Sequence, residues 1–184
     1  MDDSQAIRLL REGDIAGLEV LVQRYQERAV HAAYLICLDV EMAQDAAQEA
    51  FLRVYRRSEQ FELGRPFAPW FLRIVANETL MALRKRKRLL PLVGEAAETS
   101  LPDLSPSIEA TLLTAESHAA LRQALAMLSP KQRAAVVYRY YLGLSEAQMA
   151  DLLGCPRGTV KRRLYDARQR LRQILSDCAG TIIW

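Results

Sequence analysis

Four large polar side chains recur at helical spacing in the last third of the sequence: Arg157, Lys161, Arg162 and Tyr165. On a helix they share an outward face, because Val160 and Leu164 occupy the opposite, apolar side. Arg and Lys donate hydrogen bonds to guanine O6 and N7 and to phosphate oxygens. Thr159, together with backbone N–H groups at the start of such a helix, can hold a phosphate. These residues predict a helix that binds nucleic acid, with a solvated basic helix face as the alternative.

The residues before this stretch predict the first helix and the turn of a helix-turn-helix. Ser145 and Gln148 have the S-x-x-Q spacing of a capping box, which starts a helix. Gly154 supplies the turn after that helix, and Pro156 suits the start of the next one. Ala150 is small enough for the second helix to cross closely over the first. In this motif the second helix enters the major groove of duplex DNA.

Charge is distributed unevenly along the 184 residues. Residues 1–88 hold 14 Lys and Arg against 13 Asp and Glu, whereas residues 89–120 hold 5 acids and no Lys or Arg. Residues 121–184 hold 11 Lys and Arg against 4 Asp and Glu, a net charge of +7 in a chain whose total is +3. A basic terminal third is typical of a protein that binds a polyanion.

The apolar residues follow helical periodicity, which predicts an all-α protein of two small helical domains. One apolar stripe consists of Ala46, Ala47, Ala50, Phe51 and Val54. Ser129 and Pro130 have the residue types of an N-cap and a first helical position. Residues 89–107 combine proline, glycine and acids without a sustained period, which predicts a flexible linker. We therefore expect domains over residues 1–88 and 108–184, joined by that linker.

Residue patterns that indicate a metal site, an export signal or a membrane span are lacking from the sequence. The 3 Cys and 2 His show no metal-ligand spacing, so we expect no metal and no cofactor. The first residues are acidic and lack the apolar stretch of a signal peptide, and no run reaches the ~20 apolar residues that cross a bilayer. We expect a cytoplasmic protein without membrane insertion, without a small-molecule substrate and without catalytic activity.

Two blocks of sequence are together similar to one protein family. Asp45–Tyr55, then Phe61, then Trp70–Asn77 resemble region two of the extracytoplasmic-function (ECF) RNA polymerase sigma factors. Leu128–Arg133, Gly143–Ser145 and Gly158–Lys161 resemble region four of the same family. The blocks stand in the family's order and separation, and the resemblance covers nearly the whole chain outside the linker and the last residues.

The resemblance implies three binding surfaces. One docks on the clamp of the largest subunits of core RNA polymerase, through Asp45, Gln48, Glu49, Phe51, Leu52 and Arg53. A second melts the minus-ten promoter element and holds a flipped base, through Phe61, Arg65, Phe67, Trp70 and Asn77. Beside it, the charge of the run Arg84–Arg88, with Arg84, Lys85 and Arg88, predicts contact with duplex phosphates, and a frayed, solvated helix end is the alternative. A third holds the minus-thirty-five element, through Arg157, Gly158, Thr159, Lys161, Arg162 and Tyr165. The expected partners are core RNA polymerase, promoter DNA and an anti-sigma factor.

A flipped base needs an aromatic or apolar floor and side chains that hydrogen-bond its edge. Phe61, Phe67 and Trp70 are the candidates for the floor, with Arg65 and Asn77 as polar readers. For Trp70, base binding and core packing are equally open, whereas for Phe71 and Ile74 we expect core packing.

Two other functions remain as alternatives. A stand-alone helix-turn-helix regulator would bind an operator as a dimer, but it leaves the Asp45–Tyr55 block without a role. An enzyme acting on nucleic acid would need clustered carboxylates or a nucleophile with its base, and the helix bearing Asp45 and Glu49 fits protein docking better. Arg162 and Asp166 depart from the family, which commonly has a small residue and an Arg there, so its promoter preference does not carry over. The apolar end Thr181–Trp184 could pack on region four or contact a protein.

Overall fold

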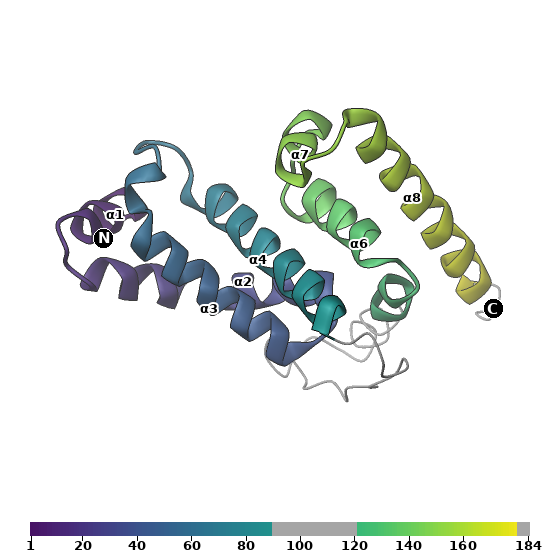
Figure 1. Ribbon diagram of the computed structural model, residues 1–184, viewed down its shortest axis with the longest axis horizontal. Helices are drawn as coiled ribbons and strands as arrows, with labels where there is room; N and C mark the ends of the chain where they lie inside the picture. The colour runs from purple at the N-terminus through teal and green to yellow at the C-terminus, as the bar shows by residue number, and fades with distance from the viewer. Residues whose placement is uncertain (90–120, 180–184) are drawn as a thin grey trace. The chain divides into compact units, whose positions relative to one another are not determined.

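The computed structural model describes residues 1–89 and 121–179, which form helices, turns and short connections (Figure 1). No β-strand occurs within these two ranges. The chain divides into two compact units, Met1–Ala96 (unit 1) and Ala97–Trp184 (unit 2). The prediction of an all-α protein with two helical parts is therefore confirmed. The predicted linker over residues 89–107, and the apolar chain end, lie almost wholly outside the described residues, so the domain limits stay predictions.

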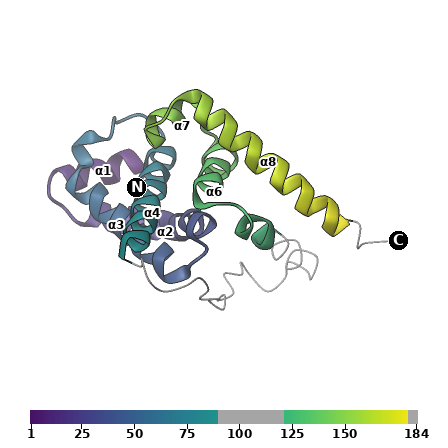
Figure 2. The ribbon, with the colours of Figure 1, turned by 45° about the vertical axis from the view of Figure 1, so that its right-hand side comes forward.

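Unit 1 consists of α1 (Asp3–Arg11), α2 (Ala16–Cys37), α3 (Val40–Arg56), the 3₁₀ helix η1 (Ser58–Gln60) and α4 (Phe67–Leu89). Helices α2, α3 and α4 pack against one another, and α1 packs on α2 (Figure 2). The side of α3 that faces its neighbours is lined by small residues, which let the helices approach closely: Ala43, Ala46, Ala47 and Ala50.

Aromatic rings from α2, α3, α4 and the loop before α4 meet in the core of unit 1. The ring of Phe71 lies 4.5 Å from that of Phe51 and 5.4 Å from that of Phe67, centroid to centroid. Tyr25 and Phe61 complete the cluster, at 5.1 and 5.7 Å from Phe67. Rings at these separations attract one another in addition to the area that they bury. Phe71 is fully buried, as expected from the sequence, and Ile74 is partly buried.

Unit 2 contains a helical segment over residues 121–126, α6 (Pro130–Val136), the π-helix η2 (Val137–Tyr141), α7 (Glu146–Leu153) and α8 (Arg157–Ala179). Helix α8 packs on α6 and α7. A buried arginine closes the turn before α6, because Arg133 Nη1 donates to the carbonyl oxygens of Leu128, at 2.9 Å, and Leu125, at 3.4 Å.

Local signals start and end the helices of unit 2 where the sequence predicted them. Ser129 caps α6 with Pro130 at its first position, and Ser145 caps α7 in a capping box with Gln148. Gly154 ends α7 with a φ of 58°, in the left-handed region that favours glycine. Helix α8 then begins at Arg157, one residue after the predicted Pro156. The predicted helix-turn-helix is therefore confirmed.

Candidate nucleic-acid interface

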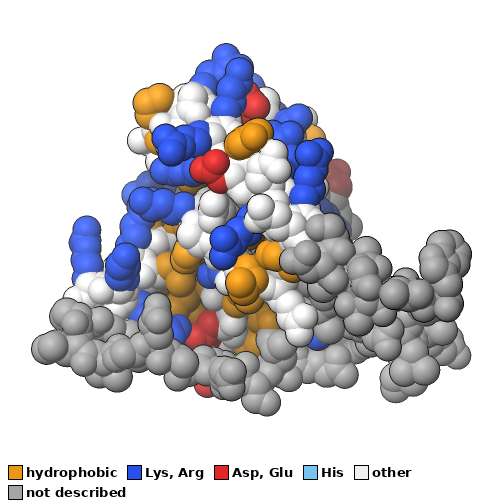
Figure 3. Space-filling model, turned by 90° about the vertical axis from the view of Figure 1, so that its right-hand side faces the viewer, with side chains coloured by type: hydrophobic (Ala, Val, Ile, Leu, Met, Phe, Trp, Pro, Cys, Tyr) orange, Lys and Arg blue, Asp and Glu red, His pale blue; other side chains and the backbone are white. Residues whose placement is uncertain are grey.

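The predicted outward face of α8 is exposed in the structure. Arg157, Lys161, Arg162 and Tyr165 all lie on the surface. The exposed side-chain fractions are 65% for Lys161 and 84% for Arg162. On the opposite side of the helix, Val160 and Leu164 are buried. The predicted orientation of α8 is therefore confirmed. Figure 3 views the molecule from the side on which α8 lies in Figure 1, and many Lys and Arg side chains are visible there.

Two of these cations have weak acidic partners. Lys161 Nζ lies 4.0 Å from Glu146 Oε2 at the start of α7, and Arg162 Nε lies 3.9 Å from Asp166 Oδ2 one turn further along α8. Exposed ion pairs of this kind contribute about 0–1 kcal/mol, so a DNA phosphate can replace either acid. Asp166 thus reduces the positive charge on the same face on which Arg162 stands.

The first turn of α8 is accessible. Gly158 is exposed, and a methyl group in place of its hydrogen would meet nothing within 4 Å. Thr159 is half-buried next to it. The turn before the helix is held by a contact between Arg163 Nη1 and Cys155 Sγ, at 3.6 Å. The predicted residues 157–159 therefore lie together at the end of α8 that the helix-turn-helix presents.

All five residues of the basic end of α4, Arg84–Arg88, are exposed, but one of them is engaged in an ion pair. Arg84, Lys85 and Arg88 are exposed, as their predicted role on duplex phosphates requires. Arg86 is different, because its Nη1 atom lies 2.7 Å from Oδ2 of Asp39, which caps the start of α3. The run Arg84–Arg88 therefore offers fewer available cations than its sequence suggests.

Two of the predicted base-binding aromatics are core residues. Phe61 is 2% exposed and Phe67 1% exposed, so neither offers a surface to a base, and this corrects the prediction for both. Their rings pack against Trp70, at 5.1 and 5.7 Å. Trp70 itself is half-buried on α4. The two buried phenylalanine rings therefore support the ring of Trp70 on its side toward the core. Tertiary packing, and not residue type, decides which of the three rings is accessible.

The polar residues predicted near the flipped base lie apart along the chain. Arg65 is 71% exposed in its side chain and pairs with Glu62 at 2.7 Å in the loop before α4. Asn77 is half-buried in the middle of α4. Both belong to the segment that begins after α3, together with Trp70.

A groove of about 450 Å³ runs between α2 and α3 and contains half of the predicted polymerase-binding residues. From α3 it is lined by Gln44, Ala47, Gln48, Phe51 and Leu52. Phe51 is buried at its floor, whereas Leu52 is half-buried and Gln48 exposed. Asp45 and Glu49 are exposed on the same helix outside the groove lining. Arg53 points elsewhere, since its Nη1 atom pairs with Glu78 of α4 at 2.7 Å.

The other wall of this groove was not recognised from the sequence. It consists of Leu18, Val22, Gln26 and Val30 of α2. Leu18 and Val22 are half-buried, whereas Leu21 and Tyr25 of the same helix are buried. The helical period of α2 does not indicate which of its apolar residues are buried and which line a groove, because this depends on how much of α2 is covered by α3.

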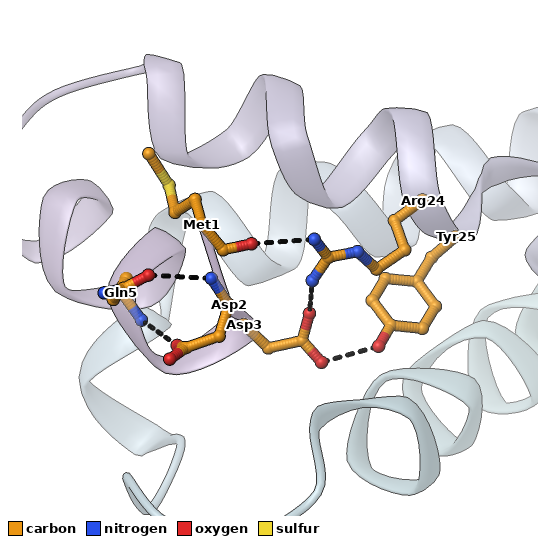
Figure 4. A network of polar contacts seen from close by, with 6 residues as sticks. All are labelled: Met1, Asp2, Asp3, Gln5, Arg24 and Tyr25. Atoms are coloured by element: carbon orange, nitrogen blue, oxygen red, sulfur yellow. Dashed lines mark hydrogen bonds and ion pairs between the residues drawn. The ribbon is translucent and has the colours of Figure 1, made fainter.

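A polar network joins α1 to α2 at the edge of the aromatic core (Figure 4). The Tyr25 hydroxyl donates to Asp3 Oδ2 at 2.6 Å, Arg24 Nη2 donates to the carbonyl oxygen of Met1 at 2.8 Å, and Arg24 also pairs with Asp3. Burial, followed by the hydrogen bond to Asp3 and the charge of that carboxylate, raises the pKa of Tyr25 to about 12. The first turn of α1 is thereby fixed to the helix that carries one wall of the groove.

The described ranges lack two further features. Residues 1–89 and 121–179 contain no group of three His, Cys, Asp or Glu side chains arranged to hold a metal ion. Within the same ranges, no helix has the length and apolarity that crossing a membrane requires.

Comparison with known protein families accounts for both units. Residues 21–89 match Sigma-70 region 2, and residues 118–171 match Sigma-70 region 4. The first match includes α3, α4 and every groove-lining residue except Leu18, and the second includes the helix-turn-helix. A stand-alone helix-turn-helix regulator would not account for the match to region 2.

Relatives of known identity match over nearly their whole length. The chain is 30% identical to the ECF RNA polymerase sigma factor SigW of Bacillus subtilis, covering 93% of this chain and 95% of that protein. It is 32% identical to the RNA polymerase sigma-H factor of Pseudomonas aeruginosa, covering 94% and 93%.

The fold also resembles solved structures. The sigma factor RpoE of Bartonella quintana, solved with the anti-sigma factor NepR, aligns with a TM-score of 0.60 and 24% identity over 86% of this chain and 96% of that chain. CnrH, solved with the cytosolic domain of CnrY, aligns with a TM-score of 0.61 and 20% identity over 95% and 97%. Regions 2 and 4 are both matched, and relatives of 30% and 32% identity are matched over more than nine tenths of their length. The chain therefore belongs to the ECF RNA polymerase sigma factors, which bind core RNA polymerase and direct transcription initiation at specific promoters.

Proposed function

We propose that each surface described above performs one step of promoter-specific initiation. The groove between α2 and α3 docks on the clamp of core RNA polymerase, and the polar residues Asp45 and Glu49 form its rim. The loop before α4 and α4 itself hold the minus-ten element as a single strand. Helix α8 holds the minus-thirty-five element as duplex DNA.

One observation carries the assignment of α8. Its cations and Tyr165 are exposed along one side, while Val160 and Leu164 fix the other side to the helix-turn-helix. This arrangement presents a rigid helix whose outward side chains can reach base edges in the major groove. Lys161 and Arg162 can donate to guanine or to phosphate, and Asp166 can accept from cytosine N4.

The minus-ten assignment rests on Trp70 and Asn77. Trp70 is partly accessible and is supported by two buried rings, so it can stack on a base without moving the core. Asn77 stands two turns further along the same helix and can hydrogen-bond a base edge. The exposed cations Arg84, Lys85 and Arg88 then follow the phosphates of the adjoining duplex.

The groove fits a helical partner. Its lining residues recur at Leu18, Val22, Gln26 and Val30, which gives α2 a continuous wall of about three turns. Core RNA polymerase and an anti-sigma factor would compete for this wall, so such a partner would keep the protein inactive. The solved complexes of RpoE with NepR and of CnrH with the cytosolic domain of CnrY support a partner of this kind. We also propose that the chain acts in the cytoplasm and performs no covalent chemistry of its own.

Run-off transcription with bacterial core polymerase and a pool of genomic promoter fragments tests the proposal. Leu52→Glu should abolish binding to core, because a carboxylate would enter the apolar groove. Ile15→Glu is the matched control, since Ile15 is 65% exposed and lies outside the groove lining. Equal binding of core by both variants would contradict the docking assignment.

The DNA-reading helix is tested on the promoters that this experiment selects. The double variant Lys161→Ala/Arg162→Ala should lose promoter binding, with a salt dependence lower by roughly 0.9 per phosphate contact removed. Arg170→Ala/Arg172→Ala removes the same charge from exposed positions further along α8 and is the control. If both double variants weakened binding equally, the effect would be one of net charge, and the assignment of residues 157–165 would be wrong.

A further inference from the structure

Arg11, the last residue of α1, reaches across unit 1 to the chain segment that follows α3. Its Nε and Nη2 atoms donate to the Ser58 carbonyl oxygen, at 3.2 and 3.0 Å. Nη2 also donates to the carbonyl oxygens of Glu59, at 3.3 Å, and Phe61, at 2.5 Å. The Arg11 side chain is only 22% exposed. One guanidinium therefore holds three backbone carbonyls that lie 47 to 50 residues away in the sequence.

Although Ser58 and Phe61 are buried, the backbone of this segment makes only short-range hydrogen bonds of its own. Helix η1 is only three residues long, and the backbone bonds from Gln60 to Arg57, from Phe61 to Ser58 and from Arg65 to Glu62 are short-range turns. A planar guanidinium with several N–H donors suits a fan of carbonyls better than any other side chain. Charge-assisted bonds of this kind are also stronger than bonds between neutral groups.

Helix α1 is itself fixed at its other end. Asp3 binds Arg24 and Tyr25 of α2, as Figure 4 shows. Gly17 of α2 approaches the backbone of α1 so closely that a methyl group there would overlap the Ala6 carbonyl oxygen. Helix α1 therefore contacts α2 near its first residue, through Asp3, and residues 58–61 at its last residue, through Arg11. A rigid α1 thus fixes the position of residues 58–61 relative to α2.

The segment in question supports the residues assigned above to the minus-ten element. Phe61, whose carbonyl Arg11 holds, packs its ring 5.1 Å from that of Trp70. Arg65 follows four residues later in the same connection to α4. A shift of the Phe61 backbone would therefore move one wall of the Trp70 site and the start of the loop that carries Arg65.

We propose that Arg11 is a positioning residue for recognition of the minus-ten element. It does not contact DNA, and it acts by holding residues 58–61 so that Trp70 and Arg65 are ready to receive the single strand. This inference rests on the minus-ten role proposed above for the loop before α4, which carries Arg65, and for Trp70 and Asn77. Loss of such preorganisation should weaken strand binding on the order of tenfold, because the loop must then be ordered during binding.

Holoenzymes containing Arg11→Gln, Arg11→Lys and the control Arg8→Gln test the inference. Arg8 lies on the same helix and is exposed. The probe is an oligonucleotide with the non-template minus-ten strand of a promoter selected in the run-off experiment. A second set of oligonucleotides carries single-base changes in that strand, one change in each. For Arg11→Gln we expect roughly tenfold weaker binding and reduced discrimination between the two strands, with core affinity within about twofold of Arg8→Gln. Strand binding by Arg11→Lys should be intermediate, because an ammonium keeps the positive charge but lacks the planar set of N–H donors that a guanidinium offers to several carbonyls.

The outcomes separate this inference from the function on which it rests. If Arg11→Gln binds and discriminates like Arg8→Gln while Trp70→Ala and Asn77→Ala lose binding, the role of Arg11 is refuted and the minus-ten assignment stands. If Trp70→Ala and Asn77→Ala also bind normally, both fall together.

A variant that does not fold is covered by a second measurement. If Arg11→Gln does not fold, amide hydrogen exchange in Arg11→Lys decides. Faster exchange confined to residues 58–66 supports the inference, and exchange unchanged from wild type refutes it.

Discussion

Replacing Gly17 by alanine should destabilise unit 1, although alanine is the better helix former. Gly17 is the second residue of α2 and faces α1. A Cβ atom at this position would overlap the Ala6 carbonyl oxygen and lie 3.1 Å from the Ala6 carbonyl carbon and the Leu10 nitrogen. All three are backbone atoms, so no change of rotamer can relieve the clash, and α1 has to move.

Two opposing terms set the size of the effect. Alanine in a helix is favoured over glycine by about 1 kcal/mol. Overpacking costs about 1–3 kcal/mol, and complete detachment of α1 would expose the buried side chains of Ile7 and Leu10 at roughly 3–6 kcal/mol together. Because the overlap is with backbone, we take the upper end of the overpacking cost, about 3 kcal/mol, and subtracting the helix gain of about 1 kcal/mol leaves an expected net loss of about 2 kcal/mol in the free energy of unfolding of unit 1.

Urea unfolding followed by tryptophan fluorescence measures this loss. The chain has 2 Trp, so a Trp184→Phe background leaves Trp70 as the reporter of unit 1. Gly158→Ala is the control, because it makes the same substitution in a helix where the added methyl group meets open space. It should leave the Trp70 transition unchanged. A Gly17→Ala protein with an equal or higher urea midpoint would refute the close approach of α1 to α2.

Three further substitutions have expected outcomes. The stability that neutral Tyr25 contributes is present below pH 10 and is lost as pH rises through about 12. Urea midpoints across this range should therefore fall less in Tyr25→Phe, and the difference in unfolding free energy should be at most about 3 kcal/mol. Arg133→Met removes the donor to two carbonyl oxygens and should lower the unfolding free energy of unit 2 by about 1–3 kcal/mol, measured by thermal unfolding with circular dichroism. Ser145→Ala removes the N-cap of α7 and should cost about 0.5–2 kcal/mol by the same measurement, whereas Ser145→Thr should restore most of it.

The helix-turn-helix could be predicted from the sequence because its signals are local. A capping box needs only Ser145 and Gln148 three residues apart, and the turn needs only a glycine at position 154. The alternation of Val160 and Leu164 with outward cations follows from helical period alone. Such features depend on residues within one or two turns, so the order of residue types along the chain is enough to place them.

The minus-ten region required the tertiary structure. Phe61, Phe67 and Trp70 are all aromatic and close in sequence, yet two are buried and one is partly accessible. Which ring reaches solvent depends on how α2, α3 and α4 pack, and the sequence order around these residues does not contain that information.

Contacts between distant segments were likewise invisible in the sequence. Nothing near Arg11 indicates that it binds carbonyls of residues 58–61, because an arginine on an amphipathic helix is most often solvated. The groove between α2 and α3 and the close approach at Gly17 depend in the same way on separate helices. The sequence by itself determined the helical class, the family and the reading helix, since these follow from local pattern and residue type. Only the tertiary structure decided which side chains are buried, paired or exposed, because burial is a property of neighbours brought together by folding.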